Sequence, residues 1–277
     1  MKGKAIYQPS GKAGEYSEWA CNLFTGCSHD CAYCYCKKGF LSRIWSDKPR
    51  LKSCFKSEDV ALITFIKEIE ANKDELRLKG LFFSFTTDPL VKETRYLHTE
   101  CFLHCAANDI QVSALTKDAE FVDDPDFFIN WKISDDAKVA QWLNIGFTLT
   151  GHDELEPYAS TNAQRIEAMK KLHERGYRTF ASVEPLVDAQ SSMAMIEQSH
   201  GYCDLYKIGL MSGKKYTESE VEEIRVMVET LKEWTDTRIY LKDTLVKLLD
   251  IDRDNLPEHF VSRHYKLMPK VKPSTAE

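Results

Sequence analysis

The chain has 277 residues, of which 43% are hydrophobic and 29% charged, with only 12 glycines and 9 prolines. This is ordinary globular composition, so collagen-like, low-complexity and disordered classes are excluded. A formal charge of −6 excludes a generally basic nucleic-acid coat but leaves room for a local basic patch. No apolar stretch reaches the roughly 18 residues of a membrane helix, and the amino terminus lacks the apolar core of a signal peptide. We therefore expect a cytoplasmic protein with no membrane contact.

Short apolar runs with β-branched or aromatic residues predict buried strands. The first lies near residues 19–24, and six more follow at 81–87, 110–116, 143–150, 178–186, 203–210 and 238–245. Amphipathic stretches at 162–176 and 218–234 have apolar residues at helical spacing, and Gly176 marks a natural helix end. Strands that alternate with helices favour parallel β/α units. The predicted fold is α/β, a partial (β/α)6-type TIM-like barrel, with a doubly wound sheet as the alternative.

No linker rich in proline, serine or glycine interrupts this alternation, so the sequence predicts one domain. We expect the barrel core to span residues 1–245. Residues 246–277 lack the strand pattern and form a C-terminal extension with a polar tail that frays.

Five of the nine cysteines fall within residues 21–36. In a reducing compartment such a cluster more often binds metal or performs redox chemistry than forms disulfides. The spacing Cys27-x3-Cys31-x2-Cys34 can provide three thiolates to a 4Fe-4S cluster and leave the fourth iron open. The alternative is a zinc site with Cys36 as fourth ligand, although structural zinc sites usually show paired C-x2-C elements. Otherwise Cys36 is a small hydrophobic residue beneath the loop.

This motif, with the aromatic Tyr33 before its last cysteine, resembles that of radical S-adenosylmethionine (SAM) enzymes. The resemblance extends to the branch that contains spore photoproduct lyase-like proteins, over about residues 18–210. Its further motifs, each at a predicted strand end or the helix that follows, are TDPLVKE at 87–93, Thr116-Lys117, Glu156-Pro157, Arg165 and VEPL at 183–186. The resemblance implies a radical SAM barrel with a 4Fe-4S cluster and SAM as cofactors.

The resemblance also implies contacts to SAM at the carboxyl ends of the strands, where β/α barrels have their active sites. An ordinary helix cap is the alternative for Asp88, and a solvated loop lysine is the alternative for Lys117. The expected cofactor-binding residues are Tyr33, Ser84, Thr86, Thr87, Asp88, Lys117 and Thr148.

Charged residues inside late strands are expensive to bury unless they are paired or face a polar cavity. Glu184, Lys207 and Lys242 are therefore candidate substrate contacts, and a mutual structural ion pair is the alternative. Glu156 and Arg165 are further candidates, and Arg165 could instead brace Glu156 across the loop.

Two other features have competing interpretations. Residues 37–52 are rich in lysine and arginine, with Phe40 and Trp45 between them, which fits a solvated loop, a nucleic-acid surface or the surface for an acidic partner protein. Cys101 and Cys105 share one face of a predicted helix. They could serve an accessory cluster, but buried apolar cysteines are the favoured interpretation.

The resemblance implies an enzyme that reductively cleaves SAM and abstracts hydrogen from an unidentified substrate. It implies a small electron donor such as flavodoxin or ferredoxin, and a looser likeness to radical SAM mobile pairs implies a second radical SAM protein as partner. A nucleic-acid-directed enzyme and a non-catalytic metal-binding or redox-sensing protein are the alternatives. Where the lyases carry a hydrogen-donating cysteine this chain has Phe85, so we expect no lesion repair.

Overall fold

The central sheet of the computed structural model, which describes residues 4–124, 127 and 140–267, has eight strands in the order β1-β2-β5-β6-β7-β8-β9-β10. Only the β1/β2 pair is antiparallel, and the seven strands from β2 to β10 run parallel. Within the described residues β1 and β10 do not pair, so the barrel is open and the predicted partial barrel is confirmed. The strands are β1 Ile6–Tyr7, β2 Ala20–Cys21, β5 Leu81–Phe83, β6 Val112–Thr116, β7 Leu143–Thr148, β8 Arg178–Leu186, β9 Leu205–Leu210 and β10 Arg238–Leu241.

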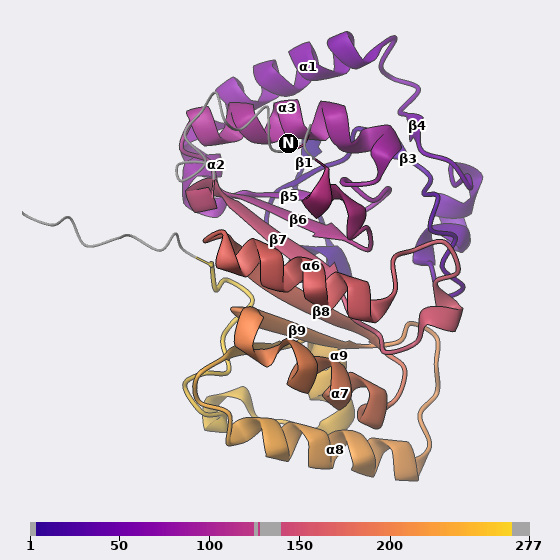
Figure 1. Ribbon diagram of the computed structural model, residues 1–277, viewed down its shortest axis with the longest axis vertical. Helices are drawn as coiled ribbons and strands as arrows, with labels where there is room; N and C mark the ends of the chain where they lie inside the picture. Colours follow the sequence, from indigo (N-terminus) through magenta and orange to yellow (C-terminus); the bar gives the residue numbers. More distant parts are fainter. Residues whose placement is uncertain (1–3, 125–126, 128–139, 268–277) are drawn as a thin grey trace, which may run out of the picture.

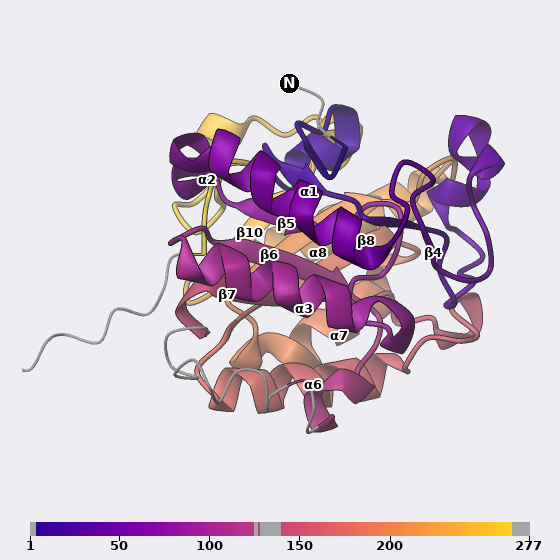
Figure 2. The same cartoon turned by 90° about the horizontal axis from the view of Figure 1, so that it is seen from above.

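Helices follow the strands and cover one face of the sheet (Figures 1 and 2). The predicted helix at 162–176 is confirmed as α6, where Thr161 and Gln164 form a capping box and Ile166, Met169 and Leu172 are buried. The helix predicted at 218–234 is confirmed as α8, with a second capping box at its start. The helices are α1 Glu58–Ala71, α2 Lys73–Lys79, α3 Lys92–Ala107, α6 Asn162–Glu174, α7 Ala189–Ser199, α8 Glu218–Lys232 and α9 Asp243–Leu249.

Most predicted strands are shorter than the sequence indicated, since the runs at 81–87, 110–116, 143–150 and 203–210 form strands only over Leu81–Phe83, Val112–Thr116, Leu143–Thr148 and Leu205–Leu210, and two further runs change their role. The run at 19–24 divides into β2, which joins the main sheet, and β3 (Phe24–Thr25), which pairs with β4 (Arg50–Leu51) in a separate two-stranded sheet. In the run at 238–245 the strand ends at Leu241, because Lys242 is the N-cap of α9. Leu245 and Leu249 are buried on one face of that helix. Lys242 therefore follows a strand rather than lying within one.

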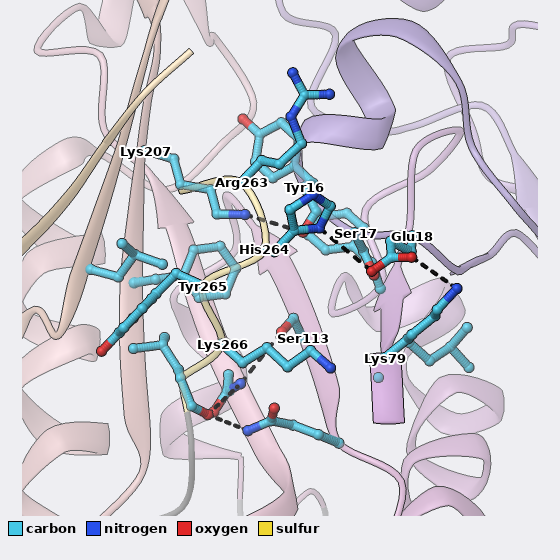
Figure 3. Close-up of a pocket in the computed structure, with 18 of the residues that line it drawn as sticks. Tyr16, Ser17, Glu18, Lys79, Ser113, Lys207, Arg263, His264, Tyr265 and Lys266 are labelled. Carbon is cyan, nitrogen blue, oxygen red and sulfur yellow. Dashed lines mark hydrogen bonds and ion pairs between the residues drawn. The ribbon is translucent and has the colours of Figure 1, made fainter. Parts of the chain in front are cut away.

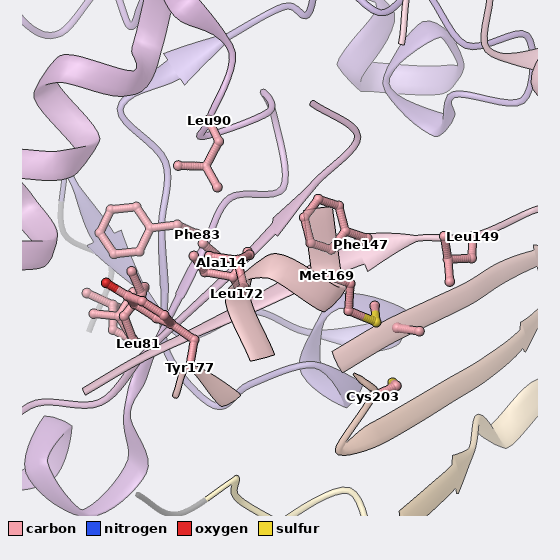
Figure 4. Close-up of a cluster of buried hydrophobic side chains, with 14 of the residues drawn as sticks. Leu81, Phe83, Leu90, Ala114, Phe147, Leu149, Met169, Leu172, Tyr177 and Cys203 are labelled. Carbon is pink, nitrogen blue, oxygen red and sulfur yellow. The ribbon is translucent and has the colours of Figure 1, made fainter. Parts of the chain in front are cut away.

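Neighbouring residues of each strand face opposite sides of the sheet, as the two-residue period requires. Phe83 and Phe147 pack against the helices in the main core, part of which Figure 4 shows. Phe82 and Phe180 face the other side, in a smaller cluster with Tyr240. Cys101, Cys105 and Cys203 are buried among apolar side chains, which matches the expectation of buried apolar cysteines for the first two.

The C-terminal segment closes the amino-terminal end of the sheet. The backbone carbonyl of Leu267 accepts hydrogen bonds from the side-chain amides of Gln111 and Asn144, the latter at 3.4 Å. Helix α9 spans residue 245, and the division there stays a prediction, as does fraying of the tail, since residues 268–277 lie outside the described part. No described helix is long and apolar enough to cross a membrane.

Candidate cofactor site

A cavity of about 440 Å³ lies at the carboxyl ends of the parallel strands. Its wall includes residues that directly follow or end β5, β6, β7 and β8, which is where β/α barrels place their active sites. Most of the predicted site residues line it together: Cys27, Cys31, Cys34, Tyr33, Ser84, Thr86, Thr87, Asp88, Lys117, Thr148, Glu184 and Lys242. The predicted candidates Glu156, Arg165 and Lys207 are not among the described residues that line it.

The three cysteines lie on a loop whose two ends are joined by the β3/β4 pair. Gly26 starts the loop with a φ of +85°, and a Cβ at this position would approach the Ser46 Oγ to 2.3 Å. Only glycine fits this turn without a shift of its neighbours. The Cys27 amide then donates to the Ser46 carbonyl at 3.0 Å, which fixes the first cysteine against the far side of the loop.

The thiols have different environments within the cavity wall. Burial raises the pKa of Cys27 to about 12, whereas a hydrogen bond from Cys36 lowers the pKa of Cys34 to about 6. Cys36 is buried as expected, but it also lines the cavity, 3.5 Å from the Phe85 carbonyl oxygen. Among the described residues, no three His, Cys, Asp or Glu side chains converge as they would around one metal ion.

Asp88 joins the cysteine loop to the ends of β5 and β6. Its carboxylate lies 2.9 Å from His29 Nε2 and accepts hydrogen bonds from the Thr116 hydroxyl at 2.8 Å and the Lys117 amide at 2.7 Å. It also accepts from the Leu90 amide at 2.9 Å. Burial would raise the pKa of Asp88, but these hydrogen bonds outweigh it and lower the pKa to about 2. Asp88 thus remains ionised with its carboxylate occupied by protein donors, and it does not cap α3, which begins after Val91.

His29 lies between the first two cysteines and was not identified from the sequence. Its ring faces two acceptors, since Nδ1 lies 3.2 Å from the Tyr158 carbonyl oxygen and Nε2 faces Asp88. Burial alone would lower the pKa of His29, but the Asp88 carboxylate raises it. The histidine ties the cysteine loop to two other loops at this end of the sheet. Its position between Cys27 and Cys31 was the feature of the sequence that could have identified His29 as a site residue.

Two polar groups that line the cavity lack a hydrogen-bond or ion-pair partner among the described residues. The Thr87 hydroxyl is buried and has no hydrogen-bond partner among the described residues. The Lys117 ammonium lies 5.6 Å from the Tyr33 ring centre, and no ion pair for it is found in the described part of the chain. Burial would lower the pKa of Lys117, but the proximity of Cys31 and Glu156 raises it. Both groups can serve a polar ligand in the cavity.

The hydroxyls of Ser84 and Thr86 donate to backbone carbonyls. Ser84 donates to Thr87 at 2.8 Å, and Thr86 donates to Phe24 at 2.6 Å, at the base of the cysteine loop. These contacts order the segment after β5. Thr148 ends β7, and its carbonyl accepts a hydrogen bond from Arg165 at 2.5 Å.

Arg165 and Glu156 form a fully buried ion pair behind the cavity wall, with both side chains 0% exposed. The Arg165 guanidinium also donates to the Ser160 carbonyl at 2.8 Å, and the Tyr33 hydroxyl donates to Glu156. The arginine therefore braces Glu156 across the loop, which is the second of the two roles considered from the sequence. Through Tyr33 this pair holds the aromatic residue that precedes Cys34.

The lining of the cavity includes a second polar group. Glu184 accepts hydrogen bonds from Lys242 at 2.6 Å and from the Tyr16 hydroxyl at 2.7 Å. Gly209 makes room for this pair, since a Cβ there would lie 2.7 Å from Lys242 Cδ. Glu15 is buried beside it, with its carboxylate 3.7 Å from the Lys242 ammonium. The ion pair considered for these strands exists for Glu184 and Lys242.

Glu15 and Tyr16 were not identified from the sequence. They belong to the 3-10 helix η1 (Gly11–Glu15) and its C-cap, which no strand or helix pattern marks. Their contacts reach β8 and the residues around β10, so only the folded chain brings them to the site.

Lys207 occupies a different place from the other two candidates. Its ammonium donates to the Tyr16 carbonyl at 3.1 Å and lies 5.0 Å from the Tyr16 ring centre. It lines a smaller pocket at the other end of the sheet, beside Arg263, His264 and Lys266 (Figure 3). Burial, followed by repulsion from Lys242, lowers the pKa of Lys207 to about 7. The structure thus separates Lys207 from the cysteine-lined cavity.

The arrangement of the sheet is shared with solved structures. A mutant of spore photoproduct lyase matches with a TM-score of 0.58 at 15% identity, covering 85% of this chain and 78% of that chain. A second mutant, with bound AdoMet and dinucleoside spore photoproduct, matches with a TM-score of 0.54 at 17% identity, covering 80% of this chain and 64% of that chain. The chain has the fold of spore photoproduct lyase. The expected likeness to the lyase branch is confirmed at the level of the fold.

In sequence, an uncharacterized protein of Methanocaldococcus jannaschii is 24% identical over 196 residues, which cover 68% of this chain and 66% of that protein. No family model matches the chain. The chain thus spans about two thirds of the length of this relative and of the lyase chain with bound AdoMet.

Proposed function

We propose that this protein is a radical SAM enzyme. In this proposal Cys27, Cys31 and Cys34 hold a 4Fe-4S cluster, and SAM occupies the adjoining cavity. The observation that carries it is that all three motif cysteines line the same 440 Å³ cavity at the carboxyl ends of the strands. The AdoMet in a lyase structure of the same fold supports it.

The residues of the wall fit these cofactors. Three thiols supply three ligands, and the spacing leaves the fourth iron open, as a catalytic site requires. The Thr87 hydroxyl, which has no hydrogen-bond partner among the described residues, and the Lys117 ammonium, which has no ion pair among them, match the polar amino-acid part of SAM, which carries an amino and a carboxylate group. When bound, the cluster would supply the electron for reductive cleavage of SAM and so generate a 5′-deoxyadenosyl radical.

The chain's own residues position and enclose these cofactors. In this proposal Lys117 would pair with the SAM carboxylate and Thr148 would contact the ribose, since both residues line the cavity. Asp88 acts as a positioning residue, because all its described contacts are to protein donors. Arg165 and Glu156 hold Tyr33 in place. The apolar middle of the cavity, which includes Phe82, Phe85, Leu115 and Met211, excludes water from a reactive intermediate.

In this proposal the substrate binds beside Glu184 and Lys242, which line the same cavity as the cysteines. The Glu184 side chain is 17% exposed and the Lys242 side chain 1% exposed. Tyr16 orients Glu184 from the side. Lys207 is less suited to contact substrate directly, because it faces the other pocket.

Anaerobic incubation of the reconstituted protein with SAM and dithionite tests the function. We expect methionine and 5′-deoxyadenosine in the wild type and neither product in Cys31→Ala. A reconstituted 4Fe-4S protein that binds SAM but releases no 5′-deoxyadenosine would contradict the proposal. A cluster whose spectrum does not respond to SAM would favour the metal-binding or redox-sensing alternative.

A nucleic-acid-directed enzyme is the second candidate. It is favoured by lyase structures that hold dinucleoside spore photoproduct and share this fold. Oligonucleotide binding that weakens with salt would support this candidate. A second radical SAM protein remains a proposed partner, to be tested by copurification.

A further inference from the structure

An exposed surface on the outer side of the cysteine loop is not used by the site described above. It surrounds the 3-10 helix η3 (Gly39–Arg43), and we call it the η3 surface. Two large apolar side chains of this short segment are exposed, Phe40 at 74% and Ile44 at 46%. Exposed apolar residues that cluster in this way mark interaction sites more often than scattered ones do. The η3 surface consists of Lys38, Phe40, Arg43, Ile44, Lys48 and Arg50.

The rim of the η3 surface is positive. Lys38, Arg43, Lys48 and Arg50 are exposed, and among the described residues none of them forms an ion pair. Arg43 lies over the Phe40 ring at 5.6 Å. Between residues 38 and 50 the only acidic residue is Asp47, although the whole chain has a formal charge of −6. The positive rim is therefore a local feature of an acidic protein, and it complements a negatively charged partner.

The inner side of the same segment faces the cysteines. Cys34 is the N-cap of the 3-10 helix η2 (Tyr35–Lys37), and its carbonyl accepts from the Lys37 amide at 3.2 Å. Trp45 lines the cavity, and the neighbouring Ser46 carbonyl accepts from the Cys27 amide. The segment that carries the η3 surface is thus in direct backbone contact with the cysteine motif.

Reductive cleavage consumes one electron for each SAM molecule, and the electron must come from a carrier outside this chain. The inner side of the cluster loop faces the cavity proposed for SAM and substrate. A carrier that must come close to the cluster therefore has to dock on the outer side of the loop.

The composition of the η3 surface favours a protein partner over a nucleic acid. An apolar centre with a charged rim is the usual anatomy of a protein interface. Electron-transfer complexes are small and weak, so a patch of this size suffices, and opposite charge accelerates their encounter. A nucleic-acid surface instead relies on an extended row of cations along the phosphates.

We propose that the η3 surface is the docking site for an acidic one-electron carrier protein of the flavodoxin or ferredoxin class. This inference rests on the proposed function. Phe40 and Ile44 form the contact centre, and Arg43, with the neighbouring lysines, steers the carrier toward the cysteine loop.

The test compares two reductants in the reconstituted holoenzyme. The rate of 5′-deoxyadenosine formation is measured with reduced flavodoxin at limiting concentration and, separately, with dithionite, for Arg43→Glu and Phe40→Ala. Matched controls are Lys67→Glu on α1 and Leu78→Ala on α2, since Lys67 is exposed and Leu78, at 73% exposure, is comparable to Phe40. In Figures 1 and 2, α2 lies on the side of the molecule away from β4.

We expect the flavodoxin-driven rate to fall by about tenfold or more in Arg43→Glu and in Phe40→Ala, and the control variants to match the wild type. Added salt should slow the wild type with flavodoxin and bring it toward Arg43→Glu. The dithionite-driven rate should be unchanged in all four variants, because dithionite needs no docking surface.

Three outcomes would overturn the inference. An unchanged flavodoxin rate in Arg43→Glu and Phe40→Ala would exclude this docking site. An equal loss with both reductants would show that the variants damage the site itself. Weaker binding of a fluorescent oligonucleotide to Arg43→Glu, with an unchanged flavodoxin rate, would assign the surface to nucleic acid. If the wild type forms no 5′-deoxyadenosine with dithionite, the result contradicts the proposed function itself. This outcome differs from a failure of the docking inference, in which the dithionite-driven activity is present.

Discussion

The carboxyl and amino ends of the central sheet both contain buried charged side chains, but these side chains differ in their partners. At the carboxyl end Asp88, Arg165 and Glu156 are held by specific partners, which leaves the thiols, Thr87 and Lys117 open toward the cavity. At the amino end Lys207 is buried near other cations and contacts backbone carbonyls and an aromatic ring. Fully partnered charges position their neighbours, whereas a poorly partnered one mainly lowers stability.

The largest expected effect separates the thiols that bind the cluster from the one that only lines the cavity. Replacing Cys27, Cys31 or Cys34 with Ala should abolish cluster assembly, because each provides one of three ligands. Cys36→Ala should retain the cluster. Iron and sulfide content with the visible absorption spectrum measures this, and loss of iron in Cys36→Ala alone would contradict the open-site assignment.

The next prediction concerns the reaction at the carboxyl end. Phe85 stands where the resemblance places a hydrogen-donating cysteine, and its ring stacks on Phe82 with 4.7 Å between centres. A phenyl ring has no labile hydrogen, so we expect no repair of spore photoproduct and stoichiometric consumption of SAM. Incubation with spore photoproduct DNA, with thymine and 5′-deoxyadenosine quantified, checks this. Restored thymine with little 5′-deoxyadenosine would contradict it.

Breaking the buried ion pair should lower stability strongly. Arg165→Met leaves the fully buried Glu156 without its cation and should lower the free energy of unfolding by about 3–5 kcal/mol. Urea denaturation measures the change. The double variant Arg165→Met/Glu156→Gln should recover a large part of it, and a single variant as stable as the wild type would show that the pair is not needed as a brace.

A smaller effect distinguishes direct from indirect contacts to SAM. Lys117→Ala and Asp88→Ala should both retain the cluster and weaken SAM binding, by about tenfold for the loss of one charge-assisted contact at Lys117. Calorimetric titration of the reconstituted protein gives the affinity. Because Asp88 acts through its neighbours, Asp88→Ala should also lower the thermal midpoint, and unchanged affinity in both variants would refute this placement.

The smallest effect is expected at the amino end. The pKa of Lys207 is about 7 in the folded protein but about 10.4 in an unfolded chain. Between these values the unfolded state binds more protons, so the stability should rise with pH. We expect Lys207→Met to remove about 1 kcal/mol of the gain in stability between pH 7 and pH 8, measured against wild type and Lys67→Met. An unchanged pH slope would show that Lys207 is not destabilised by burial.

Much of the fold follows from local pattern. The predicted helix at 162–176 formed over Asn162–Glu174, because Thr161 and Gln164 cap it and its apolar residues recur at helical spacing. The run at 178–186 became β8 within the same bounds, since a continuous apolar stretch suits a strand buried on both faces. The cysteine spacing and the polar residues after each strand also predicted one shared site, because carboxyl ends of parallel strands meet at one edge.

Only the tertiary structure decided which charged side chains contact one another. Glu15 and Lys242 are 227 positions apart, yet the open seam between β1 and β10 lets η1 place them 3.7 Å apart. Nothing local distinguishes Lys207 from Lys242, although one lines the amino-end pocket and the other the cysteine-lined cavity. The sequence by itself determined the strands, the helices and the thiol motif, since these depend on neighbours within a few residues. Pairing and burial depend on contacts between distant segments, so the roles of Arg165, Lys207 and Tyr16 emerged only in the folded chain.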